Sequence, residues 1–253
     1  MLIKIKNLDL HYKTTGTGKT AVILLHGWGH DLTTFSQLAQ ALSARFTVYS
    51  VDLPGFGLSN APTTVWGSNQ YAEVISDLMS YCHLVNPIII GHSFGGKVAL
   101  QLANQLLIQK LVLIGSSGVK LPKPLKVKVK IYTYKLMKWL NRLATIIYHQ
   151  KEPTHLESYR RQLGSADYRQ ATGIMRRILV KTVDEDLRSI MPAIKVPTLL
   201  LWGTQDKVIP LAAGKIMQTQ LPKAKLSVIA DAGHSPHLDN PTAIIEAIDS
   251  FLC

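Results

Sequence analysis

The chain has 253 residues, of which 47% are hydrophobic, and its formal net charge is +12. This length suffices for one domain with a large buried core, and the hydrophobic content excludes a disordered or fibrous chain. No apolar stretch reaches the roughly 18 residues that a membrane-spanning helix needs, and residues 1–6 lack the apolar core of a signal peptide. We therefore expect a cytoplasmic protein in which Cys82 and Cys253 are free thiols.

Predicted strands alternate with predicted helices along most of the chain. Apolar runs predict an opening hairpin and then buried strands, and helical periodicity predicts helices between them. The first strands fall at residues 2–5, 8–13, 22–25, 47–51, 88–90 and 111–114, with helices at 35–44, 68–82 and 95–105. The pattern resumes with a strand at 198–202, a helix at 211–220, a strand at 225–229 and a helix at 242–252. Such alternation predicts an α/β protein with a mostly parallel sheet between two layers of helices.

A candidate nucleophile lies between the strand at 88–90 and the following helix, in the segment Gly91-His92-Ser93-Phe94-Gly95. A sharp turn that pushes Ser93 outward crowds the residues two before and two after it. Gly91 and Gly95 leave that space empty, and Gly96 lets the helix start close to the strand. A serine hydroxyl becomes a good nucleophile when a histidine takes its proton and a carboxylate orients that histidine.

Asp206 and His234 are the candidate partners of this serine, because each follows a predicted strand whose carboxyl end lies at the same sheet edge. Other carboxylates fit less well. Residues 115–118 hold none, Asp231 is only three residues before His234, and Asp52 lies in a loop before a proline. We interpret two further histidines, His92 and His237, as structural or pocket-rim residues.

Several motifs together resemble the α/β-hydrolase fold superfamily, and in particular serine carboxylesterases of the pimeloyl-methyl-ester type. They are the serine turn, Asp206, His234, His26-Gly27-Trp28-Gly29, and Asp52-Leu53-Pro54-Gly55-Phe56-Gly57. The resemblance implies a central sheet flanked by helices, with an inserted helical cap. It also implies an oxyanion hole formed by the backbone N–H groups of Trp28 and Phe94, a loop-bracing role for His26, and no metal or organic cofactor.

The resemblance divides the chain into a hydrolase core, residues 1–118 and 193–253, and a basic helical cap or lid, residues 119–192. Between Val119 and Lys195 there are 17 Lys and Arg against 6 Asp and Glu, a net charge of +11. Apolar residues recur there at helical spacing, and we expect this stripe to face the pocket or the core; it comprises Leu125, Val129, Tyr132, Leu136, Trp139, Leu140 and Leu143. The lysines indicate either a solvated helix face or contact with an anionic substrate or membrane surface. No nucleic-acid-binding motif is present.

The serine at the turn also limits the reaction, because dehalogenases and epoxide hydrolases of this fold carry aspartate there. Ser235 after the histidine disfavours a carbon–carbon bond hydrolase, in which a tryptophan usually follows. We therefore expect a carboxylic ester hydrolase for small or medium acyl groups. The open alternatives are a carbon–carbon bond hydrolase, lactonase, thioesterase or aminopeptidase on the same fold, and a non-catalytic ligand-binding protein. The oligomeric state is left open.

Overall fold

The computed structural model describes residues 1–122, 132–133, 136–137, 139 and 166–253. Its described residues form an eight-stranded sheet in the order β1-β2-β4-β3-β5-β6-β7-β8. The strands are β1 (Leu2–Ile5), β2 (Leu8–Thr15), β3 (Ala21–Leu25), β4 (Thr47–Val51), β5 (Ile88–His92), β6 (Lys110–Ile114), β7 (Thr198–Gly203) and β8 (Ala224–Ile229). The β1–β2 and β2–β4 pairs are antiparallel and all other pairs are parallel. The opening hairpin and the mostly parallel sheet are thus confirmed.

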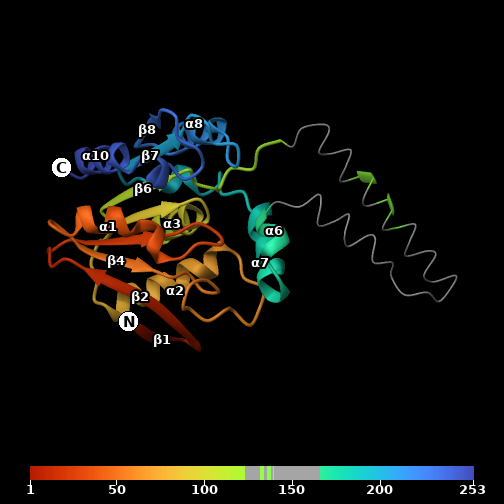
Figure 1. Ribbon diagram of the computed structural model, residues 1–253, viewed down its shortest axis with the longest axis horizontal. Helices are drawn as coiled ribbons and strands as arrows, with labels where there is room; N and C mark the ends of the chain where they lie inside the picture. Colours follow the sequence, from red (N-terminus) through yellow and green to blue (C-terminus); the bar gives the residue numbers. More distant parts are fainter. Residues whose placement is uncertain (123–131, 134–135, 138, 140–165) are drawn as a thin grey trace.

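Helices cover both faces of the sheet (Figure 1). One layer holds α2 (Ser68–Tyr81), α3 (Phe94–Gln105) and α8 (Leu211–Gln220), and the other holds α1 (Ser36–Leu42) and α10 (Pro241–Leu252). Alternation along β3 explains the two cores. Ile23 and Leu25 pack into the first layer, whereas Val22 and Leu24 pack into the second, because successive side chains of a strand point to opposite faces.

Shorter helical segments complete the described part of the chain. They are η1 (Leu32–Phe35), α6 (Ala166–Gln170), α7 (Gly173–Asp184), η2 (Met191–Ala193) and α9 (Pro236–Asp239). The single helix expected at 35–44 begins as the 3-10 turn η1 and continues as α1. No helix in the described residues combines the length and the apolar character needed to cross a membrane.

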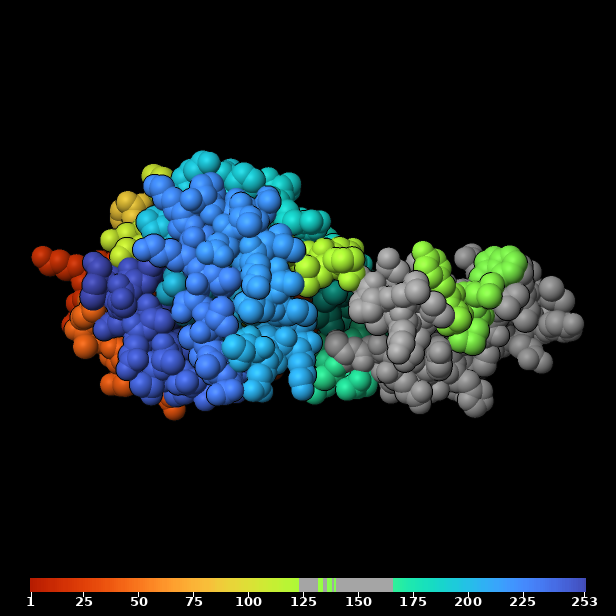
Figure 2. All heavy atoms as spheres, turned by 90° about the horizontal axis from the view of Figure 1, so that it is seen from above, coloured from red at the N-terminus to blue at the C-terminus, as the bar shows by residue number. Residues whose placement is uncertain are grey.

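The parallel strands deliver three loops to one edge of the sheet. Ser93 follows β5, Asp206 follows β7 and His234 follows β8. The helices α6 and α7 lie beside the core in Figure 1, and in Figure 2 they adjoin its blue C-terminal part. Leu179 and Thr182 of α7 line the same cavity as Ser93, so α7 lies at this edge of the sheet.

Much of the predicted cap, including Leu125, Val129, Leu140 and Leu143, lies outside the described residues, and its boundaries stay a prediction. Tyr132, Leu136 and Trp139 are described, and 69%, 56% and 57% of their surface is exposed. The expectation that these three side chains face the pocket or the core is wrong. Helical periodicity gathers apolar side chains on one face but does not supply an element that packs against it.

Candidate active site

The turn at Ser93 has the strained geometry expected of a strand-to-helix elbow. Ser93 has φ +49° and ψ −110°, in a region that side chains other than glycine rarely adopt. A Cβ at Gly91 or at Gly95 would collide with a nearby backbone carbonyl. Hydrogen bonds hold the turn: the Ser93 N–H donates to Ile114 O, and Ser93 O accepts from the N–H and hydroxyl of Ser117, all at 3.0 Å. Strain of this kind persists only where the surrounding structure imposes it, and it is common at functional sites.

The three candidate residues form one chain of hydrogen bonds. The Oγ of Ser93 lies 2.9 Å from Nε2 of His234, and Nδ1 of His234 lies 2.9 Å from Oδ2 of Asp206. The other carboxylate oxygen of Asp206 accepts from the N–H groups of Val208 at 2.9 Å and Ile209 at 2.8 Å. An acceptor at Nδ1 favours the tautomer with a proton there, which leaves Nε2 free to accept the serine proton.

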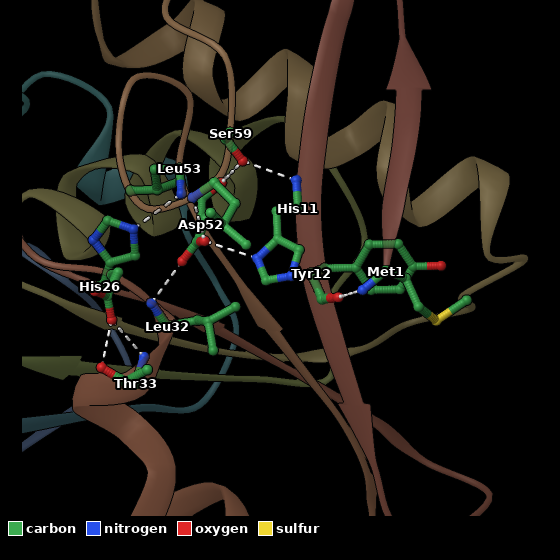
Figure 3. Close-up of polar contacts among 11 residues, drawn as sticks. Met1, His11, Tyr12, His26, Leu32, Thr33, Asp52, Leu53 and Ser59 are labelled. Atoms are coloured by element: carbon green, nitrogen blue, oxygen red, sulfur yellow. Dashed lines mark hydrogen bonds and ion pairs between the residues drawn. The ribbon is translucent and has the colours of Figure 1, made fainter.

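The two rival carboxylates lie elsewhere. Asp231 is exposed with φ +54°, and its carboxylate approaches Gln205 at 3.4 Å. Asp52 is buried, accepts from the N–H groups of Leu32 and Leu58, and lies 2.8 Å from Nδ1 of His11 (Figure 3). A carboxylate engaged by three donors in this way shapes a loop, so both observations favour Asp206 as the acid.

His26 connects that loop to the segment that carries Trp28. Its Nε2 accepts the N–H of Leu53 at 2.9 Å, so its Nδ1 donates to Gly27 O at 2.8 Å (Figure 3 shows the Leu53 contact). Burial lowers the pKa of His26 to about 4, so the ring is neutral at pH 7. The expected loop-bracing role is confirmed.

The backbone donors expected for an oxyanion hole lie beside Ser93. Trp28 and Phe94 line the same cavity as Ser93, and neither backbone N–H donates to another described residue. Phe94 is the first residue of α3, where helix N–H groups lack intrahelical partners. Gly27 allows the loop that carries Trp28 to lie close to His92, because a Cβ at Gly27 would lie 2.8 Å from Nδ1 of His92.

His92 and His237 form a buried layer behind the candidate base. Nε2 of His92 donates to the backbone oxygen of His234 at 2.9 Å. The His237 ring lies 4.5 Å from that of His92 and 4.9 Å from that of Phe35, and neither of its ring nitrogens bonds to a described residue. Burial lowers the pKa of His237 to about 4 and that of His92 well below its usual range. Both residues support the site from behind, as the structural interpretation expects.

Acid is expected to destabilise the fold because of these neutral histidines. Between the unfolded pKa of about 6.5 and the folded value of about 4, the unfolded chain binds more protons. The free energy of unfolding is therefore highest above about pH 6.5 and falls as the pH drops from about 6.5 to about 4. His26 and His237 each lower it by about 3 kcal/mol at most. His237→Leu removes a buried imidazole without hydrogen bonds to described residues, so the variant should lose less stability at pH 5.

Urea unfolding of wild-type protein and His237→Leu at pH 7.5 and pH 5 measures this effect. The exposed His83 offers a matched control, since His83→Leu should leave the pH dependence unchanged. Equal loss of stability in wild-type protein and His237→Leu would contradict the assignment of the acid effect to this ring.

Ser93 opens onto a cavity of about 360 Å³ that Trp28 and Phe94 also line. Its lining is largely apolar with a few charged side chains; it includes Trp28, Phe94, Lys97, Val119, Lys120, Leu179, Val183, Asp184, Glu185, Val208 and Ile209. Among the described residues no group of three His, Cys, Asp or Glu side chains could hold a metal. The cavity suits an apolar group attached to the carbon that Ser93 would attack.

The sequence analysis missed Lys97, Ser117 and Glu185. Ser117 bonds to Ser93 O, and the buried Lys97 ammonium reaches the backbone of Thr182 and Glu185. A signal for Lys97 existed: it is a charged residue at the start of the apolar helical run that continues with Val98, Ala99 and Leu100. Its partners follow more than 80 residues later, so that run did not identify them.

A mostly parallel sheet that brings a serine on a strained elbow together with a histidine and an aspartate defines a hydrolase of the α/β-hydrolase fold. The chain belongs to the alpha/beta hydrolase family, whose model matches residues 22–247. An uncharacterised protein of Mycobacterium tuberculosis is 27% identical over 277 residues, which cover 95% of this chain and 77% of that protein.

Two further comparisons agree with this assignment. A pimeloyl-[acyl-carrier protein] methyl ester esterase of Nitrosomonas europaea is 27% identical over 256 residues, which cover 96% of this chain and 99% of the relative. The crystal structure of the enol-lactonase from Burkholderia xenovorans LB400 superposes with a TM-score of 0.76 at 23% identity, covering 100% of this chain and 99% of that one. At this identity the solved structure shows the common fold alone.

Proposed function

We propose that the protein hydrolyses carboxylic esters of small or medium acyl groups through an acyl-enzyme intermediate. The observation that carries the proposal is the hydrogen-bond chain from Ser93 through His234 to Asp206, beside a largely apolar cavity. The similarity to a methyl ester esterase of Nitrosomonas europaea supports an ester as the substrate. An ester-cleaving serine requires a base, an orienting acid and donors for the oxyanion, and a candidate exists for each.

The reaction proceeds in two halves. Ser93 Oγ attacks the ester carbonyl carbon while its proton passes to Nε2 of His234. The resulting oxyanion accepts from the N–H groups of Trp28 and Phe94, and its collapse breaks the bond to the alkoxy group, which leaves as the alcohol with the proton from His234. Water then gives a proton to His234 and attacks the acyl carbon. As the bond between this carbon and Ser93 Oγ breaks, His234 returns the proton to Ser93 Oγ and the acid is released.

An assay with p-nitrophenyl acetate and p-nitrophenyl butyrate tests the proposal. Release of p-nitrophenol by the purified protein, together with labelling by a fluorophosphonate probe, is the expected result. Rates measured on a panel of thioesters, lactones and peptides then show which type of bond the protein hydrolyses fastest. Failure to hydrolyse any member of the panel, with no labelling, would favour a ligand-binding protein.

The basic cap expected at residues 119–192 predicts a second, weaker interaction with an anionic lipid surface. The net charge of +11 between Val119 and Lys195 creates a positive field that attracts anions and that salt screens. Tyr132, Leu136 and Trp139 add exposed apolar surface to this cap, which suits the interface of a bilayer. We expect the protein to sediment with anionic liposomes in low salt and to be released near about 0.5 M salt.

Charge-neutralised variants check this prediction. Lys128, Lys135 and Lys138, which lie outside the described residues, are changed together to Gln, and this variant should bind anionic liposomes less while keeping its ester turnover. The matched control changes Lys13, Lys223 and Lys225, all exposed on the core, to Gln. Equal sedimentation with neutral and anionic liposomes, or none with either, would contradict the membrane contact and favour the interpretation that these lysines form a solvated helix face.

A further inference from the structure

Lys97 is a buried lysine one helical turn after Ser93 on α3, with only 3% of its surface exposed. Its ammonium donates to the backbone oxygens of Thr182 and Glu185, the latter at 3.1 Å, at the C-terminal end of α7. The last carbonyls of a helix lack intrahelical partners and carry partial negative charge. The end of α7 therefore compensates the buried charge of Lys97.

Glu185 ties the same end of α7 to a third helix. Its carboxylate accepts from the N–H of Ser68, the first residue of α2, at 3.0 and 3.2 Å. The free N–H groups at a helix N-terminus favour a carboxylate. Gly67 leaves room for it, because a Cβ at that position would collide with the Glu185 side chain. The end of α7 is thus held between α3 and α2.

The apolar contacts of α7 with the described core are limited. Of its 12 residues Ile178, Leu179 and Thr182 are buried, and Ile174 and Met175 pack partly buried against the core. Val180 and Val183 are 46% and 61% exposed. A helix with so small a buried face depends more on its polar anchors. Lys97 and Glu185 are such anchors.

The anchored helix forms one wall of the cavity at Ser93. Leu179, Thr182 and Val183 of α7 line this cavity together with Val208 and Ile209, which follow Asp206. The acyl group of an ester bound at Ser93 would therefore occupy space that the position of α7 helps to define. A shift of this wall changes the fit of long acyl groups more than that of an acetyl group, which needs little of the cavity.

We propose that Lys97 is a specificity-determining residue, which sets the acyl selectivity of the cavity by fixing α7 to the helix that carries the nucleophile. The proposal rests on the ester hydrolysis proposed above. Lys97 acts through α7 and is a positioning residue, with no role in moving the proton at Ser93.

The charge of Lys97 is present under ordinary assay conditions. Burial lowers its pKa to about 8, while the neighbouring carboxylates of Glu185, Asp186 and Asp184 act in the opposite direction and Lys120 adds to the lowering. At pH 7 most of the lysine is still protonated. Kinetics at this pH therefore test the charged anchor.

Lys97→Met tests the proposal, because methionine keeps an apolar stem in the same space and removes the donor. For p-nitrophenyl hexanoate we expect kcat/KM to fall about 10-fold or more, mainly through KM, since one poorly fitted methylene is worth that much. For p-nitrophenyl acetate we expect a smaller loss than for the hexanoate, because an acetyl group needs little of the cavity that α7 borders.

Lys110→Met is the matched control. Lys110 also donates to a carbonyl near the end of a helix, Phe251 O of α10, at 2.7 Å. It lies at the start of β6, whereas Ser93 contacts Ile114 at the other end of that strand. This variant should leave the acetate-to-hexanoate ratio unchanged. The same shift of that ratio in both lysine variants would overturn the proposal.

Hydrogen–deuterium exchange gives a readout that needs no substrate. In Lys97→Met the amides of α7 should exchange faster while those of α10 do not change, and Lys110→Met should show the reverse. Unchanged α7 exchange, or equal losses for both esters, would overturn the role of Lys97. Wild-type protein that hydrolyses neither ester would instead overturn the proposed function, so the two failures are distinguishable.

Discussion

Replacing Ser93 with alanine is expected to lower ester hydrolysis by about 10⁴–10⁶-fold, the range found when a triad member is removed from other serine hydrolases. The reason is that Ser93 Oγ lies 2.9 Å from Nε2 of His234, the group that would accept its proton. Without it no acyl-enzyme forms, and the oxyanion donors and the cavity alone give slow hydrolysis. Steady-state kinetics with p-nitrophenyl butyrate measure the loss.

Two further measurements make this result specific. Fluorophosphonate labelling should disappear in Ser93→Ala. Thermal unfolding should show a folded protein, because alanine fits in the space of serine and the hydroxyl that it lacks bonds to His234. Ser80→Ala, at an exposed position of α2, is the matched control and should keep full activity and labelling. An alanine variant at position 93 with more than about a tenth of wild-type activity would exclude Ser93 as the nucleophile.

The elbow was predictable from sequence because all its determinants are local. Gly91 and Gly95 lie two residues from Ser93. The apolar strand ends directly before this segment, and the helix begins directly after Ser93. Asp206 and His234 could be selected for a topological reason, since parallel strands place the loops at their carboxyl ends together. The hydrogen bonds that join the three residues confirm that these loops meet.

Contacts between distant segments were not predictable in the same way. The partners of Lys97 lie 85 and 88 positions further along the chain, and nothing near Lys97 indicates a helix end opposite it. The contact between the tilted rings of His237 in α9 and His92 in β5 likewise joins segments that are far apart in the sequence. The apolar stripe of the cap shows the converse limit. Its periodicity predicts a helix face, but Tyr132, Leu136 and Trp139 are exposed, because a partner surface is a property of the tertiary structure.

The base and the acid are expected to differ in how much activity their loss removes. His234→Ala should be about as damaging as Ser93→Ala, because Nε2 of His234 is the group that accepts the serine proton. Asp206→Asn should be milder, with a loss of about 10⁴-fold, because the base remains but its tautomer is wrong. An asparagine at position 206 can turn an N–H donor toward Nδ1, which then accepts and leaves the proton on Nε2, where it blocks transfer from Ser93.

The chain offers a matched control for the acid. Asp231 is the rival carboxylate nearest to His234 in sequence, it is exposed, and Asp231→Asn makes the same chemical change. Measured side by side, Asp206→Asn should lose activity and Asp231→Asn should keep it within about 3-fold. The loss in Asp206→Asn should fall on kcat and kcat/KM alike, because the carboxylate stabilises the imidazolium that forms only as the reaction proceeds. A fully active Asp206→Asn together with an inactive Asp231→Asn would move the acid to Asp231 and require the loop before His234 to rearrange in the working enzyme.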